Sequence, residues 1–90
     1  MTKYQIKFKN SSVEAAWYSL ENDIPEPMER CKQFIQENPE DRIKSGGKLK
    51  KLKGKLNGIL QYDITYRTRI HYKVGPGEHV VYIEYVGYHP

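Results

Sequence analysis

The spacing of apolar residues changes its period twice along the chain, and this change limits the possible fold more than any other feature. Apolar and polar residues alternate over Thr2–Lys9, which predicts a half-buried strand. Apolar residues then recur every three or four positions over about Ser12–Glu21 and again from Met28 to near Asn38, which predicts two helices. Alternation returns in three later runs, which are Ile59–Thr65, Arg67–Val74 and His79–Val86.

Residues that favour helix ends and turns lie between these segments. Asn10 and the two serines after it offer side chains that can cap the first helix. Pro25 and Pro27 suit the first turn of the second helix, and Pro39 ends it by disfavouring helical geometry in the residue before it. Residues 75–78 read Gly-Pro-Gly-Glu and predict a hairpin turn between the last two strands.

The order of these elements, β-α-α-β-β-β, predicts a single α+β domain over residues 1–90. An antiparallel sheet would have both helices packed on one face and would leave the other face open. The helix-covered side of the first late strand should carry Leu60, Tyr62 and Ile64. Residues Arg42–Asn57 are rich in glycine and lysine and predict a basic loop. Its leucines predict a short helical turn within that loop, at Leu49, Leu52 and Leu56.

Composition disfavours several classes of site and location. Cys31 is the only cysteine and lies on an expected core face, which excludes an internal disulfide and favours the reducing cytoplasm. No apolar run approaches the roughly 20 residues of a membrane span or forms a secretion signal, so we expect a soluble protein that is not exported. His71, His79 and His89 lack the spacing of metal ligands, and residues 45–48 lack that of a phosphate-binding loop. We therefore expect no metal and no cofactor.

Charge is divided unevenly between the two halves of the chain. Up to Asp41, five basic residues face eight acidic ones, whereas from Arg42 onward ten basic residues face three acidic ones. A basic half of this kind is typical of proteins that bind a polyanion such as nucleic acid. A solvated, lysine-rich surface without a ligand is the competing interpretation.

The basic half also holds most of the tyrosines. Cations neutralise phosphates while aromatic rings stack on unpaired bases, which is how single-stranded RNA is commonly bound. The residues predicted to contact RNA are Lys48, Lys51, Lys55, Arg67, Tyr66 and Tyr88. For each tyrosine a purely structural role is the alternative, because tyrosine favours strands.

Two further residues have side chains suited to phosphate chemistry. Arg69 lies in the middle of an expected strand, where its guanidinium would give bidentate contact to a phosphate. A cross-strand ion pair with Glu84 is the alternative for this arginine. His89 carries an imidazole whose ordinary pKa near about 6.5 suits proton transfer at neutral pH. The alternative for His89 is a terminal histidine without a role.

Three segments of the basic half, Leu49–Ile64, Tyr66–Val74 and Tyr85–His89, follow a recognisable order. A leucine-lysine pair and a leucine-x-glycine step precede an aromatic-rich strand. A strand with arginine and tyrosine comes next, and a last strand ends in a tyrosine-histidine pair. This order, over about the last 40 residues, resembles the RelE/ParE superfamily of toxins from toxin–antitoxin systems. The β-α-α-β-β-β order agrees with the fold that this resemblance implies.

The resemblance implies roles for individual residues. The strand arginine of the family's motif falls on Arg69, which would stabilise the scissile phosphate. The motif lysine falls on Lys53, and the histidine of the YoeB-like branch, an acid or base there, falls on His89. Lys50 or Lys53 would complement His89 in proton transfer.

The sequence also departs from the family's pattern. Lys50 stands where the YoeB-like branch has a glutamate, and Asp63 and Thr65 replace strand lysines of the RelE-like branch. The sequence ends at Pro90 without the terminal tyrosine of both branches. These departures concern the efficiency of cleavage more than the fold.

The function implied by the resemblance is a metal-free endoribonuclease that cuts ribosome-bound mRNA and so inhibits translation. A cognate antitoxin protein would hold it inactive, through an acidic helical segment that covers the Lys48–Lys55 run and Arg69. The alternative is a member that does not cleave RNA: a ParE-like inhibitor of DNA gyrase, or a decayed toxin that only binds its antitoxin.

Overall fold

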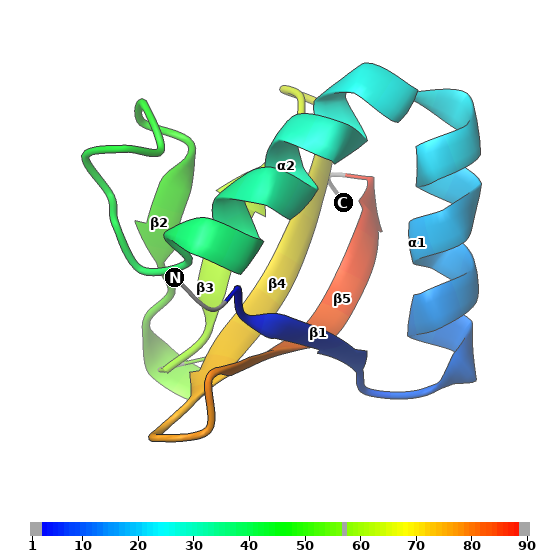
Figure 1. The fold of residues 1–90 in the computed structure, drawn as a ribbon. Coiled ribbons are helices and arrows are strands. Elements are labelled where there is room, and N and C mark those ends of the chain that lie inside the picture. The colour runs from blue at the N-terminus through cyan, green and yellow to red at the C-terminus, as the bar shows by residue number, and fades with distance from the viewer. Residues whose placement is uncertain (1–2, 57, 89–90) are drawn as a thin grey trace.

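The computed structural model describes residues 3–56 and 58–88, in which two helices lie against a five-stranded sheet (Figure 1). The helices are α1 (Ser11–Asp23) and α2 (Pro25–Glu37). The strands are β1 (Gln5–Phe8), β2 (Leu49–Lys51), β3 (Leu60–Asp63), β4 (Thr68–Gly75) and β5 (Val80–Tyr88). A single 3-10 turn, η1 (Gly54–Leu56), lies between β2 and β3. None of the helices in these residues has the length and apolar content to cross a membrane.

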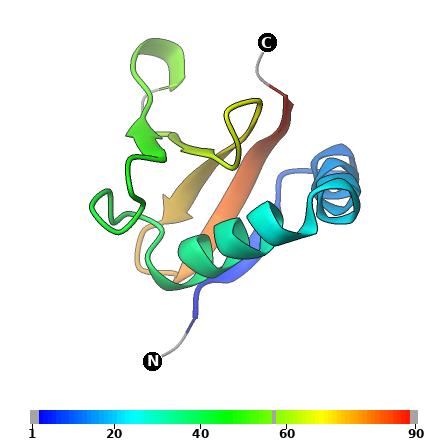
Figure 2. The same cartoon turned by 90° about the horizontal axis from the view of Figure 1, so that it is seen from above.

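The strands follow the spatial order β1-β5-β4-β3-β2. The predicted α+β class, with its two helices on one face, is confirmed. The sheet is mixed rather than wholly antiparallel, because β1 runs parallel to β5 while the other neighbours are antiparallel. The reason is topological: α1 and α2 carry the chain across one face to the far edge, so β1 borders the last strand and not the next one (Figures 1 and 2).

Strand β2 was not predicted, and it changes the interpretation of the Arg42–Asn57 segment. Leu49 pairs with Tyr62 and is only 2% exposed, so it enters the core from an edge strand. Leu52 is half-buried, and Leu56 is 46% exposed in η1. The prediction of one helical turn fixed by three leucines is therefore wrong: a 3-10 turn is present, but only Leu49 is anchored.

Both helices begin and end at the expected residues or close to them. The Asn10 side chain caps α1 by accepting a hydrogen bond from the Val13 amide at 2.9 Å. Pro25 is the first residue of α2, where a missing N–H costs nothing. The amide of Asn38 donates to the Phe34 carbonyl at 2.7 Å, and the chain then turns away at Pro39.

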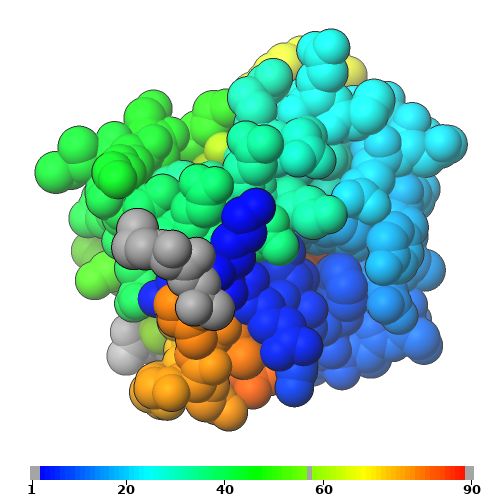
Figure 3. All heavy atoms as spheres, viewed as in Figure 1, coloured from blue at the N-terminus to red at the C-terminus, as the bar shows by residue number. Residues whose placement is uncertain are grey.

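The core lies between the helices and one face of the sheet. In the space-filling view from the helix side, α1, α2 and the edge strand β1 cover much of the rest of the sheet (Figure 3). Cys31 is completely buried there, as expected, and burial raises the pKa of its thiol far above the usual value. The side chains predicted to face the helices do so, with the Phe34 and Tyr62 rings stacked at 5.1 Å. The buried apolar residues of the strands, together with Ile64 directly after β3, are Leu49, Leu60, Tyr62, Ile64, Ile70, Tyr72, Val80, Val81, Ile83 and Val86.

Candidate functional site

The face of the sheet opposite the helices carries two rows of polar and aromatic residues. Antiparallel register partners point to the same face, so one row can be followed across four strands. It consists of Lys50, Gln61, His71 and Tyr85. The row beside it consists of Asp63, Arg69 and Gly87. The register between neighbouring strands therefore brings residues of β2, β3, β4 and β5 together on this face.

Hydrogen bonds join five of these residues into a network that we call the open-face cluster: Lys50, Gln61, Asp63, Arg69 and His71. Arg69 Nη1 donates to Gln61 Oε1 at 3.0 Å, and His71 Nε2 lies 3.1 Å from the same oxygen. Gln61 Nε2 donates to Asp63 Oδ1 at 3.0 Å. Asp63 Oδ2 forms an ion pair with Lys50 Nζ at 3.2 Å. The carboxylate, the amide and the two cations therefore hold one another in place.

Gln61 is the centre of the cluster and is only 6% exposed. A buried amide is costly unless its oxygen and nitrogen are both hydrogen-bonded, and here both are. Within residues 3–56 and 58–88, every buried side-chain nitrogen or oxygen has a hydrogen-bond partner. The Gln61 side chain is therefore held in one position, and it in turn positions the Arg69 guanidinium.

Arg69 is half-buried and is the second residue of β4, so it lies near the start of the strand and not at its middle, where the sequence predicted it. The alternative ion pair with Glu84 does not form: Arg69 bonds to Gln61, and the ion pair found among the described residues joins Lys50 to Asp63. A guanidinium has several N–H donors, and the bond to Gln61 uses one of them. Arg69 is thus held in position with donors left for an anion on the open face.

His71, two residues after Arg69, joins the same face and was not predicted as a site residue. Its ring lies 5.3 Å from that of Tyr85, at an interplanar angle of 46°. Burial, and to a lesser degree the Arg69 charge, lower the pKa of His71 below its usual value. The signal that could have found it is its alternation with buried Ile70 and Tyr72, which puts it beside Arg69 on the opposite face.

Tyr85 and Gly87 form the β5 side of the site. The Tyr85 hydroxyl donates to the Tyr88 carbonyl at 2.9 Å. A Cβ at Gly87 would lie only 2.7 Å from that hydroxyl, so a glycine at this position leaves the space that the phenol occupies. Gly87 is also the register partner of Arg69. Because the Tyr85 phenol lies over Gly87, the Tyr85 side chain is next to Arg69.

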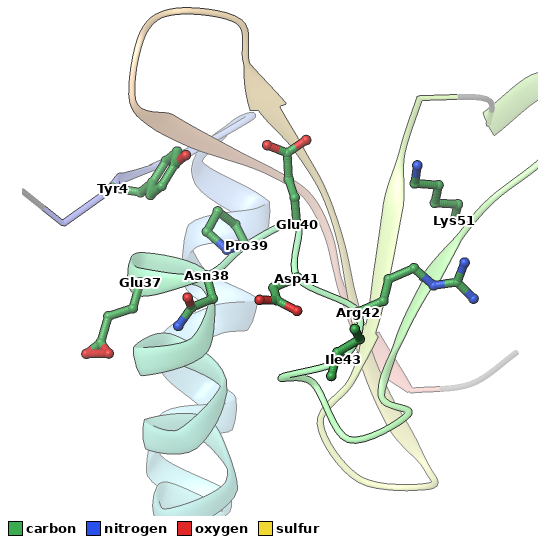
Figure 4. Close-up of a pocket in the computed structure, with 9 residues that line it drawn as sticks. All are labelled: Tyr4, Glu37, Asn38, Pro39, Glu40, Asp41, Arg42, Ile43 and Lys51. Carbon is green, nitrogen blue, oxygen red and sulfur yellow. The ribbon is translucent and has the colours of Figure 1, made fainter.

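The predicted lysines are distributed over both faces of the sheet and do not form one patch. Lys50 belongs to the open-face cluster, but Lys51 lies on the helix side, because successive strand residues point in opposite directions. There it lines a shallow depression of about 550 Å³ with Glu40 and Arg42 (Figure 4). Lys53 and Lys55 are exposed, the latter in η1, and Lys48 is half-buried before β2.

The remaining predicted residues lie around the rim of the open face or outside the described residues. Tyr66 is 84% exposed in the turn between β3 and β4, and the Arg67 guanidinium lies 5.3 Å from the centroid of its ring. Tyr88 is exposed at the end of β5. His89 lies outside the described residues. The described ranges contain no group of three or more His, Cys, Asp or Glu residues able to hold a metal ion.

Comparisons with known proteins give matches in structure but none in sequence. No protein-family model matches the chain, and a search of curated proteins finds no match. A solved structure of the YoeB/ParE toxin from Agrobacterium tumefaciens has a TM-score of 0.71 and 17% identity, covering 96% of this chain and 99% of that one.

Two other similar structures are toxin–antitoxin complexes. The YoeB-YefM complex from Staphylococcus aureus has a TM-score of 0.68 and 17% identity, over 97% of this chain and 98% of that one. The RelBE2 complex from Mycobacterium tuberculosis has a TM-score of 0.65 and 17% identity, over 99% of this chain and 94% of that one. The chain therefore has the fold of these toxin structures, which confirms the resemblance seen in the sequence at the level of fold.

Proposed function

We propose that this chain is the toxin of a toxin–antitoxin system and acts as a metal-free endoribonuclease on mRNA. The observation that carries the proposal is Arg69, fixed by Gln61 on an uncovered sheet face with a titratable group beside it. The fold shared with the YoeB and RelBE2 structures supports the same class of protein. The uneven charge of the chain supports a polyanionic substrate.

In the proposed reaction, a base takes the proton of a ribose 2′-hydroxyl, and the 2′-oxygen attacks the adjacent phosphorus. Arg69, held in position beforehand, stabilises the negative charge that develops on the phosphate oxygens. Tyr85 and the exposed Tyr66 and Tyr88 offer ring faces on which splayed bases can stack. Cations outside the cluster, among them Arg67 and Lys53, contribute to binding of the RNA backbone.

Cleavage by purified protein tests the proposal. We expect the wild-type protein to cut mRNA, in the presence of ribosomes, and Arg69→Ala to cut it at least about a hundredfold more slowly. Arg42→Ala is the matched control, because Arg42 is an exposed arginine on the helix side. Equal cutting by wild type and Arg69→Ala would remove Arg69 from the mechanism.

Induction in cells separates this function from its alternative. An RNA-cutting toxin stops protein synthesis before any damage to DNA, whereas an inhibitor of DNA gyrase causes DNA damage first. A specific observation favours the alternative: Lys50 is engaged with Asp63 where the YoeB-like branch has a glutamate. DNA damage preceding the loss of protein synthesis would decide for the gyrase inhibitor.

The partner in this proposal is an antitoxin whose acidic segment lies along the β2 edge of the sheet. Strand β2 is one of the two outer strands, and its two lysines point to opposite faces, so a segment following this edge meets cations on both sides. The exposed Ile43 and Leu56, close to this edge in sequence, offer apolar contacts for such a segment.

Charge reversal tests the site of docking. We expect replacement of Lys50, Lys51 and Lys53 by glutamate to weaken antitoxin binding and to make it less sensitive to salt. Affinity that stays unchanged in this triple variant, at low and high salt, would place the partner elsewhere.

A further inference from the structure

The orientation of the Gln61 side-chain amide is determined from two sides. Its nitrogen donates to the Asp63 carboxylate, and its oxygen accepts from the Arg69 guanidinium. Turning the amide over would set its oxygen against a carboxylate oxygen and its N–H groups against those of an arginine. Neither arrangement makes a hydrogen bond, so the amide has one stable orientation.

This orientation fixes the position of the proton on His71. The Gln61 oxygen has no hydrogen to donate, so His71 Nε2, at 3.1 Å, must carry the proton of their hydrogen bond. A neutral imidazole has one N–H, and the other ring nitrogen is then an acceptor. Nδ1 of the neutral His71 ring is therefore left as a base, on the face that also carries Arg69.

We propose that His71 is the general base of the RNA cleavage proposed above, with Nδ1 taking the proton of the 2′-hydroxyl next to the phosphate that Arg69 binds. This assignment rests on the proposed function and gives the proton-transfer role to a β4 residue in place of His89. Gln61 and Asp63 are positioning residues: they do not contact RNA, but they hold the imidazole and fix its tautomer.

The step balances in atoms and charge. The 2′-hydroxyl proton moves to Nδ1 as the 2′-oxygen forms a bond to phosphorus. The bond from phosphorus to the 5′-oxygen breaks, and the leaving 5′-oxygen takes a proton from solvent. The products are a 2′,3′-cyclic phosphate and a free 5′-hydroxyl, and His71 returns its proton to solvent before the next turnover.

Burial and the neighbouring arginine favour the neutral form of His71 at neutral pH. Burial and the adjacent Arg69 both lower the pKa of the imidazole. The titratable and charged side chains that share its face are Lys7 from β1, Lys50 from β2, Asp63 from β3, Arg69 and Lys73 from β4, and Tyr82, Glu84 and Tyr85 from β5. Asp63 is paired with Lys50, which limits its attraction for a proton on His71. Cleavage should then rise with pH through the imidazole pKa and level off above it.

The pH dependence of RNA cleavage tests the assignment with a matched pair of variants. We expect His71→Asn to lower kcat/KM about a hundredfold or more and to abolish the rise with pH. His79→Asn is the control, because His79 lies at the far end of the β4–β5 hairpin, stacked on Tyr4 and outside the cluster. It should keep the wild-type rate and pH profile.

Gln61→Glu gives a readout that a merely structural role would not produce. A carboxylate at this position still accepts from Arg69 and His71, but its negative charge favours the charged imidazole. We expect the rise in kcat/KM to move to higher pH while the plateau remains measurable. The fold of each variant is checked by its melting temperature and its circular dichroism.

The possible outcomes separate the two proposals. Wild-type protein that cuts no RNA overturns the proposed function. Wild-type protein that cuts RNA, together with His71→Asn that cuts it at the same rate and with the same pH profile, overturns only the role of His71. Nitrogen-15 NMR of the imidazole gives an independent readout, and a proton found on Nδ1 in the neutral ring would also overturn the role.

Discussion

The two faces of the sheet differ in kind although the same strands supply both. On β4, Ile70 and Tyr72 are completely buried against the helices, while Arg69 and His71 alternate with them and lie on the open face. The covered face is apolar and closely packed, and the open face is a hydrogen-bonded polar surface. Residues that stabilise the fold therefore alternate along β4 with residues of the candidate site. Mutation of the first kind should lower stability, and mutation of the second kind should lower activity.

The largest effect on stability should come from the covered face. Ile70→Ala removes a fully buried side chain between β3, β5 and the helices, and should lower the free energy of unfolding by about 2–5 kcal/mol. Urea denaturation measures the loss. The neighbouring Arg69→Ala is the comparison, and an equal loss of stability in that variant would contradict the division between the faces.

A smaller effect is expected for a polar contact that crosses the covered face from β4. The buried Tyr72 hydroxyl donates to the carbonyl of Pro39, which follows α2, and burial raises the pKa of this tyrosine far above its usual value. Tyr72→Phe leaves that carbonyl without this partner and should cost about 1–2 kcal/mol. Tyr85→Phe, with its hydroxyl on the open face, should cost less in the same denaturation experiment.

The ion pair on the open face should contribute still less. The Lys50 side chain is 58% exposed, so solvent screens its attraction to Asp63. Lys50→Ala should change the free energy of unfolding by less than about 1 kcal/mol. Thermal melts at low and high salt check this, and a loss as large as that of Ile70→Ala would show that the cluster stabilises the fold.

The smallest difference in stability, between wild type and His71→Asn, should appear only at acidic pH. Because the folded-state pKa of His71 is lowered, the unfolded chain binds a proton first as the pH falls below about 6.5. Stability from this group is therefore complete above that pH and decreases as the pH falls toward the folded-state pKa. His71→Asn should show a shallower decrease than wild type as the pH falls below about 6.5, and identical profiles would contradict the lowered pKa.

Sequence patterns predicted the covered face better than the open one. Alternation along β4 and helical spacing along α1 and α2 are local signals, and each assigned the buried residues correctly. The β1–β5 pairing and the three-residue β2 depend on contacts between distant segments, which no local period encodes. The Lys48–Lys55 run looked continuous for the same reason, since only the pairing of β2 shows that Lys50 and Lys51 point apart.

The candidate site was predicted in part. Arg69 could be predicted because it stands within an expected strand whose other-facing residues, Ile70 and Tyr72, are apolar. Gln61 and His71 could not, because their importance comes from the register that brings a buried amide between an arginine and a histidine. A neutral side chain such as Gln61 gives no signal of its own in composition or charge.

The pairing of β1 with β5 has a consequence for the time at which the protein folds. Ile6 lies beside Val81 and Phe8 beside Ile83, so the first strand finds its neighbour only after the last strand has been synthesised. Translation delivers the N-terminal segment first, and β1, α1 and α2 must wait with their apolar sides incompletely buried. Contacts between such distant segments also slow folding relative to a helical chain of similar size. The interval between synthesis and closure of the sheet is therefore the period in which these apolar sides are most open to aggregation.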